Sequence, residues 1–312
     1  MIGHSPRSVP TRAPSHDRRR NAAVWLIAAA LVAPAAPAGA SPEARVGDER
    51  AGFIRTFHER SLVGAVDARC RLFTPEVATA LKAATLQARG AAARAGADDA
   101  ALTQADASAR SVAGRTACDD ADLAVVRERV TSAYSAWAGV RRMEFPGERS
   151  VWKADRTTFA TPDWRLMQAT TTGGASVGFG LVAEGAAPDE VAAVVSFPGK
   201  SRPYAARIVM RDADRLHRPW LRDGAAALPP EAGRSVVFAA ASHEAAPDLL
   251  ASGRDQGEVW TFGADVAARL AALDPREPFV VEFLFHDDSM ARARFEVGDL
   301  AAGRAFTAMG SL

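Results

Sequence analysis

The spacing of apolar residues changes once along this chain, near residues 143–147, and that change constrains the fold more than any other feature. Before it, apolar residues recur every three or four positions, as on one face of a helix. After it, apolar and polar residues alternate, as along a half-buried strand. Pro146 and Gly147 mark the boundary. We therefore predict an α+β protein, with a helical domain over 41–146 and a β-rich domain over 147–312.

Four helices are expected in the helical domain. They lie within residues 48–142, the first ending near Cys70, the second at Gly96 and the third near Arg115, with the fourth starting after Asp119 or Asp120. Thr74 supplies a capping hydroxyl directly before Pro75, which is a favoured first residue of a helix. We expect the second and third helices to form an antiparallel hairpin.

Short strands separated by Gly, Pro and Asp turns are expected in the β-rich domain. The candidates are 151–154, 164–171, 176–183, 191–197, 205–211, 235–241, 258–262, 279–285 and 291–297. Short helices over 263–273 and 299–309 interrupt the end of this series. Many short strands of this kind predict a mostly antiparallel, sandwich-like domain.

The first 40 residues have the order of a secretory signal. Arg18, Arg19 and Arg20 precede an uncharged run, and Ala38-Gly39-Ala40 supplies the small residues that a signal peptidase accepts. The apolar stretch over residues 22–33 is shorter than the roughly 20 residues that a membrane span needs. We therefore predict a signal peptide over 1–40, a mature chain in the periplasm or secreted medium, and no membrane span after cleavage. An uncleaved anchor is the alternative.

The chain has two cysteines, Cys70 and Cys118. In an exported protein an even number of cysteines favours disulfide formation. We predict that the two are bonded to each other and fasten the open end of the expected helical hairpin. The alternative, a redox or nucleophilic thiol, lacks a CxxC motif.

The charge balance argues against nucleic-acid binding. The whole chain has 38 Lys and Arg against 37 Asp and Glu, and removing residues 1–40 leaves a slight acidic excess. Nucleic-acid-binding domains are instead strongly basic. Asn21, inside the predicted signal, is the only Asn in the sequence, so the mature chain has no Cys-His-Asn triad.

One segment matches the GxSxG pattern of serine hydrolases, namely residues 174–178 with Ser176 at the centre. A nucleophile elbow needs a strand before the serine and a helix after it. The sequence after Ser176 is strand-like, and Gly173-Gly174 is typical of a hairpin turn, which we favour. A triad of Ser176 with Asp212 or Asp214 and with His243 or His286 stays the alternative.

Histidines and tryptophans are the other candidate site residues. The histidines after residue 40 are His58 on a helix, His217 in the charged loop after Arg211, and His243-Glu244 and His286-Asp287-Asp288 at strand ends. The last two groups offer zinc or manganese ligands but lack a recognised spacing, and Asp-Asp-Ser is also a natural turn. The tryptophans Trp152, Trp164, Trp220 and Trp260 are expected in the core, or lining a groove for a sugar or peptide.

Two resemblances can be drawn. Residues 70–73 together with 87–96 resemble a group of uncharacterised secreted proteins of alphaproteobacteria, which implies a cysteine-paired helical front and a β-rich back. Residues 273–300 are weakly similar to the periplasmic invasion-associated locus B group, whose β-sandwich ends with a strand and a short helix. Neither resemblance transfers a functional residue.

These features predict an exported, non-catalytic binding or envelope-associated module. Its partner would be an unidentified protein or envelope ligand, with no nucleic acid, cofactor or metal involved. No catalytic residue is assigned. A serine hydrolase using Ser176 is the alternative function.

Overall fold

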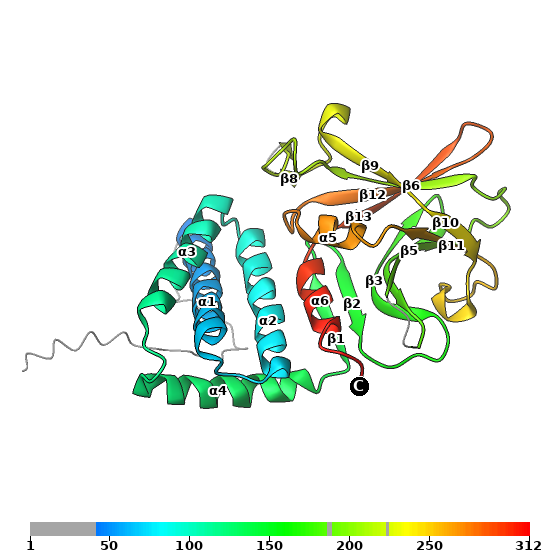
Figure 1. Ribbon diagram of the computed structural model, residues 1–312. Helices are drawn as coiled ribbons and strands as arrows, with labels where there is room; N and C mark the ends of the chain where they lie inside the picture. The colour runs from blue at the N-terminus through cyan, green and yellow to red at the C-terminus, as the bar shows by residue number, and fades with distance from the viewer. Residues whose placement is uncertain (1–41, 186–188, 223–224) are drawn as a thin grey trace, which may run out of the picture. The chain divides into compact units, whose positions relative to one another are not determined.

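The computed structural model describes residues 42–185, 189–222 and 225–312 of the 312-residue chain, as Figure 1 shows. The predicted signal peptide, residues 1–40, lies outside the described residues. Helices occupy the first part of the described chain, antiparallel sheets follow, and short helices lie near the C-terminal end. The predicted α+β class is confirmed.

Four helices precede the first strand: α1 (Pro42–Cys70), α2 (Pro75–Arg94), α3 (Asp99–Arg115) and α4 (Ala121–Ala138). Asp98 caps α3 and Asp120 caps α4, because their carboxylates accept backbone N–H groups of the first turn at 2.7 and 3.0 Å. Thr74 occupies the N-cap of α2 but makes no side-chain capping bond, contrary to the prediction.

The helical packing differs from the expected hairpin. α1 packs against both α2 and α3, whereas α2 and α3 have little direct contact. Phe57 of α1 lies in one apolar cluster with Ala92 of α2 and Leu102 of α3. The large side chains of α1 fill the space that the alanines of α2 leave, so α1 takes the central place.

Cys70 and Cys118 form the predicted disulfide, with their Cα atoms 5.4 Å apart. The bond joins the end of α1 to the loop before α4, and Arg69 adds a hydrogen bond to the Thr116 carbonyl at 2.9 Å. The cysteines are 48 residues apart. A cross-link over that length lowers the entropy of the unfolded chain, which stabilises the folded state by about 4 kcal/mol in the chain-entropy model.

Two antiparallel sheets follow the helices. The seven-stranded sheet has the order β1 (Arg142–Pro146), β2 (Val151–Asp155), β3 (Asp163–Thr172), β4 (Ala175–Ala183), β5 (Glu190–Val195), β11 (Glu258–Phe262) and β10 (Ala241–Glu244). The four-stranded sheet has the order β13 (Met290–Glu296), β12 (Pro278–Leu284), β6 (Ala205–Arg211) and β9 (Arg234–Phe238), and β7 (Leu221–Arg222) pairs with β8 (Ala225–Ala226). The shorter helices are η1 (Glu231–Gly233), η2 (Pro247–Leu249), α5 (Val266–Ala271) and α6 (Leu300–Thr307).

Each expected strand is present, with two corrections. The first correction is β1, which begins at Arg142 and so lies before the predicted domain boundary at 146. The sequence did not predict this strand, because only Phe145 among its residues is buried and the alternation of apolar and polar residues is therefore weak. The expected strand 235–241 ends at Phe238, and the chain resumes as β10.

Residues 234–244 belong to both sheets, because β9 pairs with β6 and β10 pairs with β11. The Ala239 N–H donates to the Ala206 carbonyl at 2.9 Å in the four-stranded sheet. The next residue, Ala240, donates to the Thr261 carbonyl at 2.8 Å in the seven-stranded sheet. The chain therefore passes from one sheet to the other between these two alanines.

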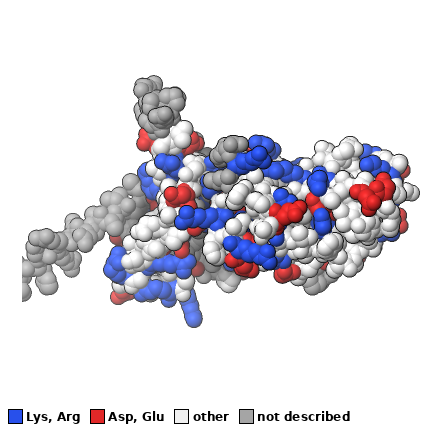
Figure 2. Space-filling model, turned by 90° about the horizontal axis from the view of Figure 1, so that it is seen from above, with Lys and Arg blue, Asp and Glu red and all other residues white. Residues whose placement is uncertain are grey.

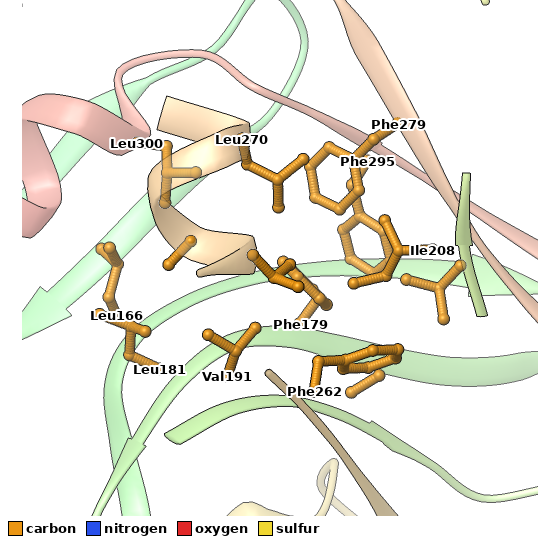
Figure 3. Close-up of a cluster of buried hydrophobic side chains, with 14 of the residues drawn as sticks. Leu166, Phe179, Leu181, Val191, Ile208, Phe262, Leu270, Phe279, Phe295 and Leu300 are labelled. Atoms are coloured by element: carbon orange, nitrogen blue, oxygen red, sulfur yellow. The ribbon is translucent and has the colours of Figure 1, made fainter. Parts of the chain in front are cut away.

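The inner faces of the two sheets enclose an aromatic core (Figure 3). Phe179 of β4 lies at its centre, with ring centroids 4.9 Å from Phe279 and 5.5 Å from Phe295. Trp152 is fully buried beside them. Helices α5 and α6 add leucines to the same cluster, so a single core holds both sheets together.

The described residues form one compact unit, in which α2 packs against α6. Arg94 donates two hydrogen bonds to the buried Asp299 carboxylate, at 2.5 and 2.9 Å. A side chain at Gly90 would overlap that carboxylate, so glycine permits the approach. Trp137 of α4 adds a ring contact to Phe306 of α6 at 5.7 Å.

Candidate binding pocket

Ser176 lies in a strand that follows a tight hairpin turn. Thr172 and Ala175 are paired, and Gly173 and Gly174 between them have φ values of +53° and +78°. Two positive φ angles in a two-residue loop define a type I′ hairpin, for which glycine is favoured. β4 then continues to Ala183, so no helix follows Ser176 and the nucleophile elbow is not formed.

The other members of the hypothetical triad lie elsewhere. His243 is exposed on β10, and His286 is exposed in the β12–β13 turn, with its ring 5.0 Å from that of Tyr204. Asp212 accepts the Asp214 N–H at 3.0 Å within its own loop. None of the described residues that line the pocket around Ser176 is a histidine. The structure does not bring the triad together.

That pocket, with a volume of about 240 Å³, lies on the outer face of the seven-stranded sheet. Its floor is one cross-strand row, in which Ala169 of β3 pairs with Gly178 of β4 and Gly178 pairs with Val194 of β5. The alternate residues Val177 and Phe179 point into the core. Because the floor residues are small, the row leaves a hollow between taller neighbours.

Trp164 forms one wall of the pocket. Its indole ring lies directly over Gly178, where a Cβ would come within 2.8 Å of a ring atom. The indole Nε1 donates a hydrogen bond to the Leu249 carbonyl at 3.2 Å. The glycine and the hydrogen bond together hold the ring against the sheet.

A β-bulge puts Trp164 on this face. The pairing of β3 with β4 shifts between Trp164 and Leu166, leaving Arg165 without a partner on β4. Residues two apart normally share a face, but here Trp164 faces outward and Leu166 enters the core. Gly180 pairs with Met167, directly after the bulge, where a side chain on Gly180 would overlap the Leu166 backbone.

The opposite wall is the segment 245–251, which contains η2 and folds over the outer face of the sheet. Its start is fixed by a hydrogen bond from the Ala245 N–H to the Gly257 carbonyl at 2.9 Å. Thr161 donates to the Asp248 carboxylate at 2.8 Å. Leu249 is buried in a small apolar cluster on this face, separate from the main core. The wall is therefore anchored at several points.

The polar groups near the pocket are few. The Ser176 hydroxyl makes no side-chain hydrogen bond within the described part of the chain, and the buried Ser196 donates its hydroxyl to the Gln256 carbonyl. Burial raises the pKa of the nearby Asp163, the Trp164 N–H bond opposes this rise, and the Asp248 charge adds to it. The pocket is thus a largely apolar hollow, whose lining also includes the hydroxyls of Ser176 and Ser196 and the carboxylate of Asp248.

The candidate metal ligands do not converge. Over residues 42–185, 189–222 and 225–312, no group of three His, Cys, Asp or Glu side chains is placed to hold a metal ion. His286 belongs to the β12–β13 turn, where Asp287 accepts the N–H and the hydroxyl of Ser289 at 3.0 and 2.6 Å. Asp288 in this turn has φ +61°. The acidic residues thus form the turn itself.

Tryptophan burial divides the four candidates. Trp152 and Trp260 are core residues, Trp220 is 40% exposed, and Trp164 lines the pocket. Sequence reasoning left a groove position open for this group but could not identify Trp164. It did not predict that segment 245–251 forms a wall of the pocket. The apolar pair Leu249-Leu250, in an otherwise loop-like stretch, is the feature that could have indicated a segment packed over the sheet.

No protein-family model, curated protein or solved structure matches the chain. Within the part of the chain that the structure describes, no helix has both the length and the apolar character that a membrane span requires. The two resemblances drawn from the sequence stay predictions.

Proposed function

We propose that this chain is an exported, non-catalytic binding module whose outer-face pocket accepts one apolar side chain or a short alkyl segment of an envelope component or partner protein. The construction of the pocket is the observation that carries the proposal. Trp164 and segment 245–251 form apolar walls over a floor of Ala169, Gly178 and Val194. Apolar walls with a few placed polar groups are typical of recognition sites.

The size of the pocket supports a small occupant. Its volume of about 240 Å³ lies below the roughly 300–1,000 Å³ of sites for drug-sized molecules. One side chain of a partner protein, or part of an acyl chain, is a better match for such a hollow.

The alternative, a serine hydrolase using Ser176, gains little support from its surroundings. A general base must come within about 3 Å of the proton that it removes. Asp248 is the only titratable residue among the described residues of the lining, and Thr161 already donates to its carboxylate.

Export is part of the proposal. It is supported by the signal-like residues 1–40 and by the Cys70–Cys118 disulfide, since structural disulfides persist in oxidising compartments. Intact-mass analysis of the exported protein should give a chain that begins at Ser41. A retained N-terminus would contradict cleavage at this position.

The pocket can be tested by ¹⁹F NMR on protein labelled with fluorotryptophan, with N-acetyl-leucine amide and N-acetyl-phenylalanine amide as probes. The Trp164 resonance, assigned by Trp164→Phe, should shift on addition of either probe. Ala169→Leu fills the floor and should abolish the shift. Thr171→Leu, on the same face of β3 but outside the lining, is the matched control and should leave it intact.

A second experiment on the same protein distinguishes the binding module from the serine hydrolase. A fluorophosphonate probe should leave Ser176 unlabelled, as judged by mass spectrometry of the peptide that contains it. Labelling that is lost in Ser176→Ala would establish the hydrolase alternative. If no probe shifts the Trp164 resonance, the pocket proposal fails.

A further inference from the structure

The outer face of the four-stranded sheet has an unusual arrangement of side chains. One cross-strand row consists of Phe238, Arg207, Glu282 and Arg292, read from β9 to β13. The next row consists of Val236, Val209, Val280 and Arg294. We call the three valines and Phe238 the apolar half of the face, and Arg207, Glu282, Arg292 and Arg294 its cationic half.

The apolar half is exposed to solvent. Phe238 is 54% exposed and Val236 is 45% exposed, both on β9 at the edge of the sheet. Val209, which pairs with Val236, and Val280, which is next in the same row, are buried, so the row continues as apolar surface away from the exposed pair. Aromatic side chains are enriched at protein interfaces, and neighbouring exposed apolar residues indicate an interaction surface better than a single one does.

The cationic half has fewer carboxylates than guanidinium groups. Glu282 is shared by Arg207 at 2.7 Å and Arg292 at 3.0 Å. Arg294 is exposed and makes no ion pair with any residue that the structure describes. The Arg207 guanidinium also lies 5.8 Å from the Phe238 ring centroid, which links the two halves. Figure 2 shows Lys and Arg side chains in blue and Asp and Glu side chains in red, interspersed over the face of the molecule that is seen from above Figure 1.

We propose that this face binds an acidic peptide segment of a partner protein, one that carries a large apolar residue. The apolar residue of the peptide packs on Val236 and Phe238, and the carboxylates of the peptide pair with Arg292 and Arg294. Neighbouring strands lie about 4.8 Å apart, so β9 and β13 are about 14 Å apart, a distance that four or five extended residues cover.

The central carboxylate favours a protein over an anionic membrane. Glu282 lies between Arg207 and Arg292 and would face a surface of uniform negative charge if lipid headgroups covered the sheet. A peptide can place a neutral or donor group opposite it. This proposal does not depend on the pocket beside Trp164, which lies on the other sheet.

The test uses the full chain and a fluorescein-labelled peptide, Gly-Leu-Ser-Gly-Glu-Ser-Glu-Glu-Gly, with fluorescence anisotropy as the readout. Arg292→Gln with Arg294→Gln should weaken binding by about tenfold or more, as should Phe238→Ser. The matched control is Arg127→Gln with Arg129→Gln, two exposed arginines at the same spacing on α4. It should leave binding unchanged, and 0.5 M salt should weaken binding of the wild-type chain.

Four results would overturn the proposal. The first is no binding of the peptide, and the second is equal binding of a version with Gln in place of Glu. The third is stronger binding to vesicles of phosphatidylglycerol than to the peptide. The fourth is a dimer, seen by sedimentation, that the Arg292→Gln, Arg294→Gln variant loses, because a second copy would then be the occupant. Circular dichroism of each variant checks that it is folded, and Trp164→Phe should bind the peptide normally.

Discussion

The buried ion pair between Arg211 and Glu277 offers a sharp test of the packing. Their side chains are 5% and 2% exposed, and two hydrogen bonds of 2.6 and 2.9 Å join them. Glu277→Gln keeps the size of the side chain but leaves the Arg211 charge without a counter-ion. Removing one partner of a buried pair costs about 3–5 kcal/mol, so the free energy of unfolding should fall by that amount.

Urea unfolding with the disulfide intact measures this loss. The control is Arg142→Gln, which breaks a pair with Asp155 in which the Arg142 side chain is 78% exposed. Such a surface pair contributes at most about 1 kcal/mol. The double variant Arg211→Met, Glu277→Leu buries no charge and should be more stable than Glu277→Gln. A loss below about 1 kcal/mol for Glu277→Gln would refute the reasoning, since it would mean that the unpaired charge stays hydrated.

Three further predictions concern other parts of the fold. Thiol titration of the denatured, unreduced chain should find no free thiol, and reduction of Cys70–Cys118 should lower the free energy of unfolding by about 4 kcal/mol. Gly178→Val should displace the Trp164 ring, cost about 1–3 kcal/mol in urea unfolding and move the Trp164 fluorine resonance; an unmoved resonance would contradict the contact. Burial raises the pKa of Asp299 above 3.8, with Arg94 opposing the rise. The folded chain therefore binds this proton more tightly than the unfolded chain. The free energy of unfolding should fall as the pH rises from about 3.8, the unfolded-state pKa, through the higher pKa of the folded state. Asp299→Asn should remove this part of the pH dependence, and identical slopes for the two proteins would be the contrary result.

The elements that the sequence predicted correctly are those with a local signal. The alternation along β4 and the glycines at 173 and 174 identify a hairpin without reference to any distant residue. The capping residue Asp120 identifies the start of α4 in the same way. The disulfide was predictable because the chain contains only two cysteines.

The remaining features depend on contacts between distant segments. Arg211 ends the strand expected over 205–211, but its pairing with Glu277, 66 residues away, has no local signal in the sequence. The place of α1 between α2 and α3 follows from how Phe57 meets the alanines of α2, which periodicity does not report. The pocket likewise needs the bulge at Arg165 and a wall more than 80 residues further along the chain. Local patterns predict which elements form, but not which of them meet.

The passage of residues 234–244 from one sheet to the other has a consequence for how the β-rich part opens. β9 and β10 are consecutive in the chain, and β10 is an edge strand of the seven-stranded sheet. Separating β9 from β6 therefore pulls on β10. Neither sheet can release this strand without straining the other. In native-state hydrogen exchange, the amide hydrogens that β9 donates to β6 and those that β10 donates to β11 should therefore exchange with the same opening free energy and the same dependence on denaturant.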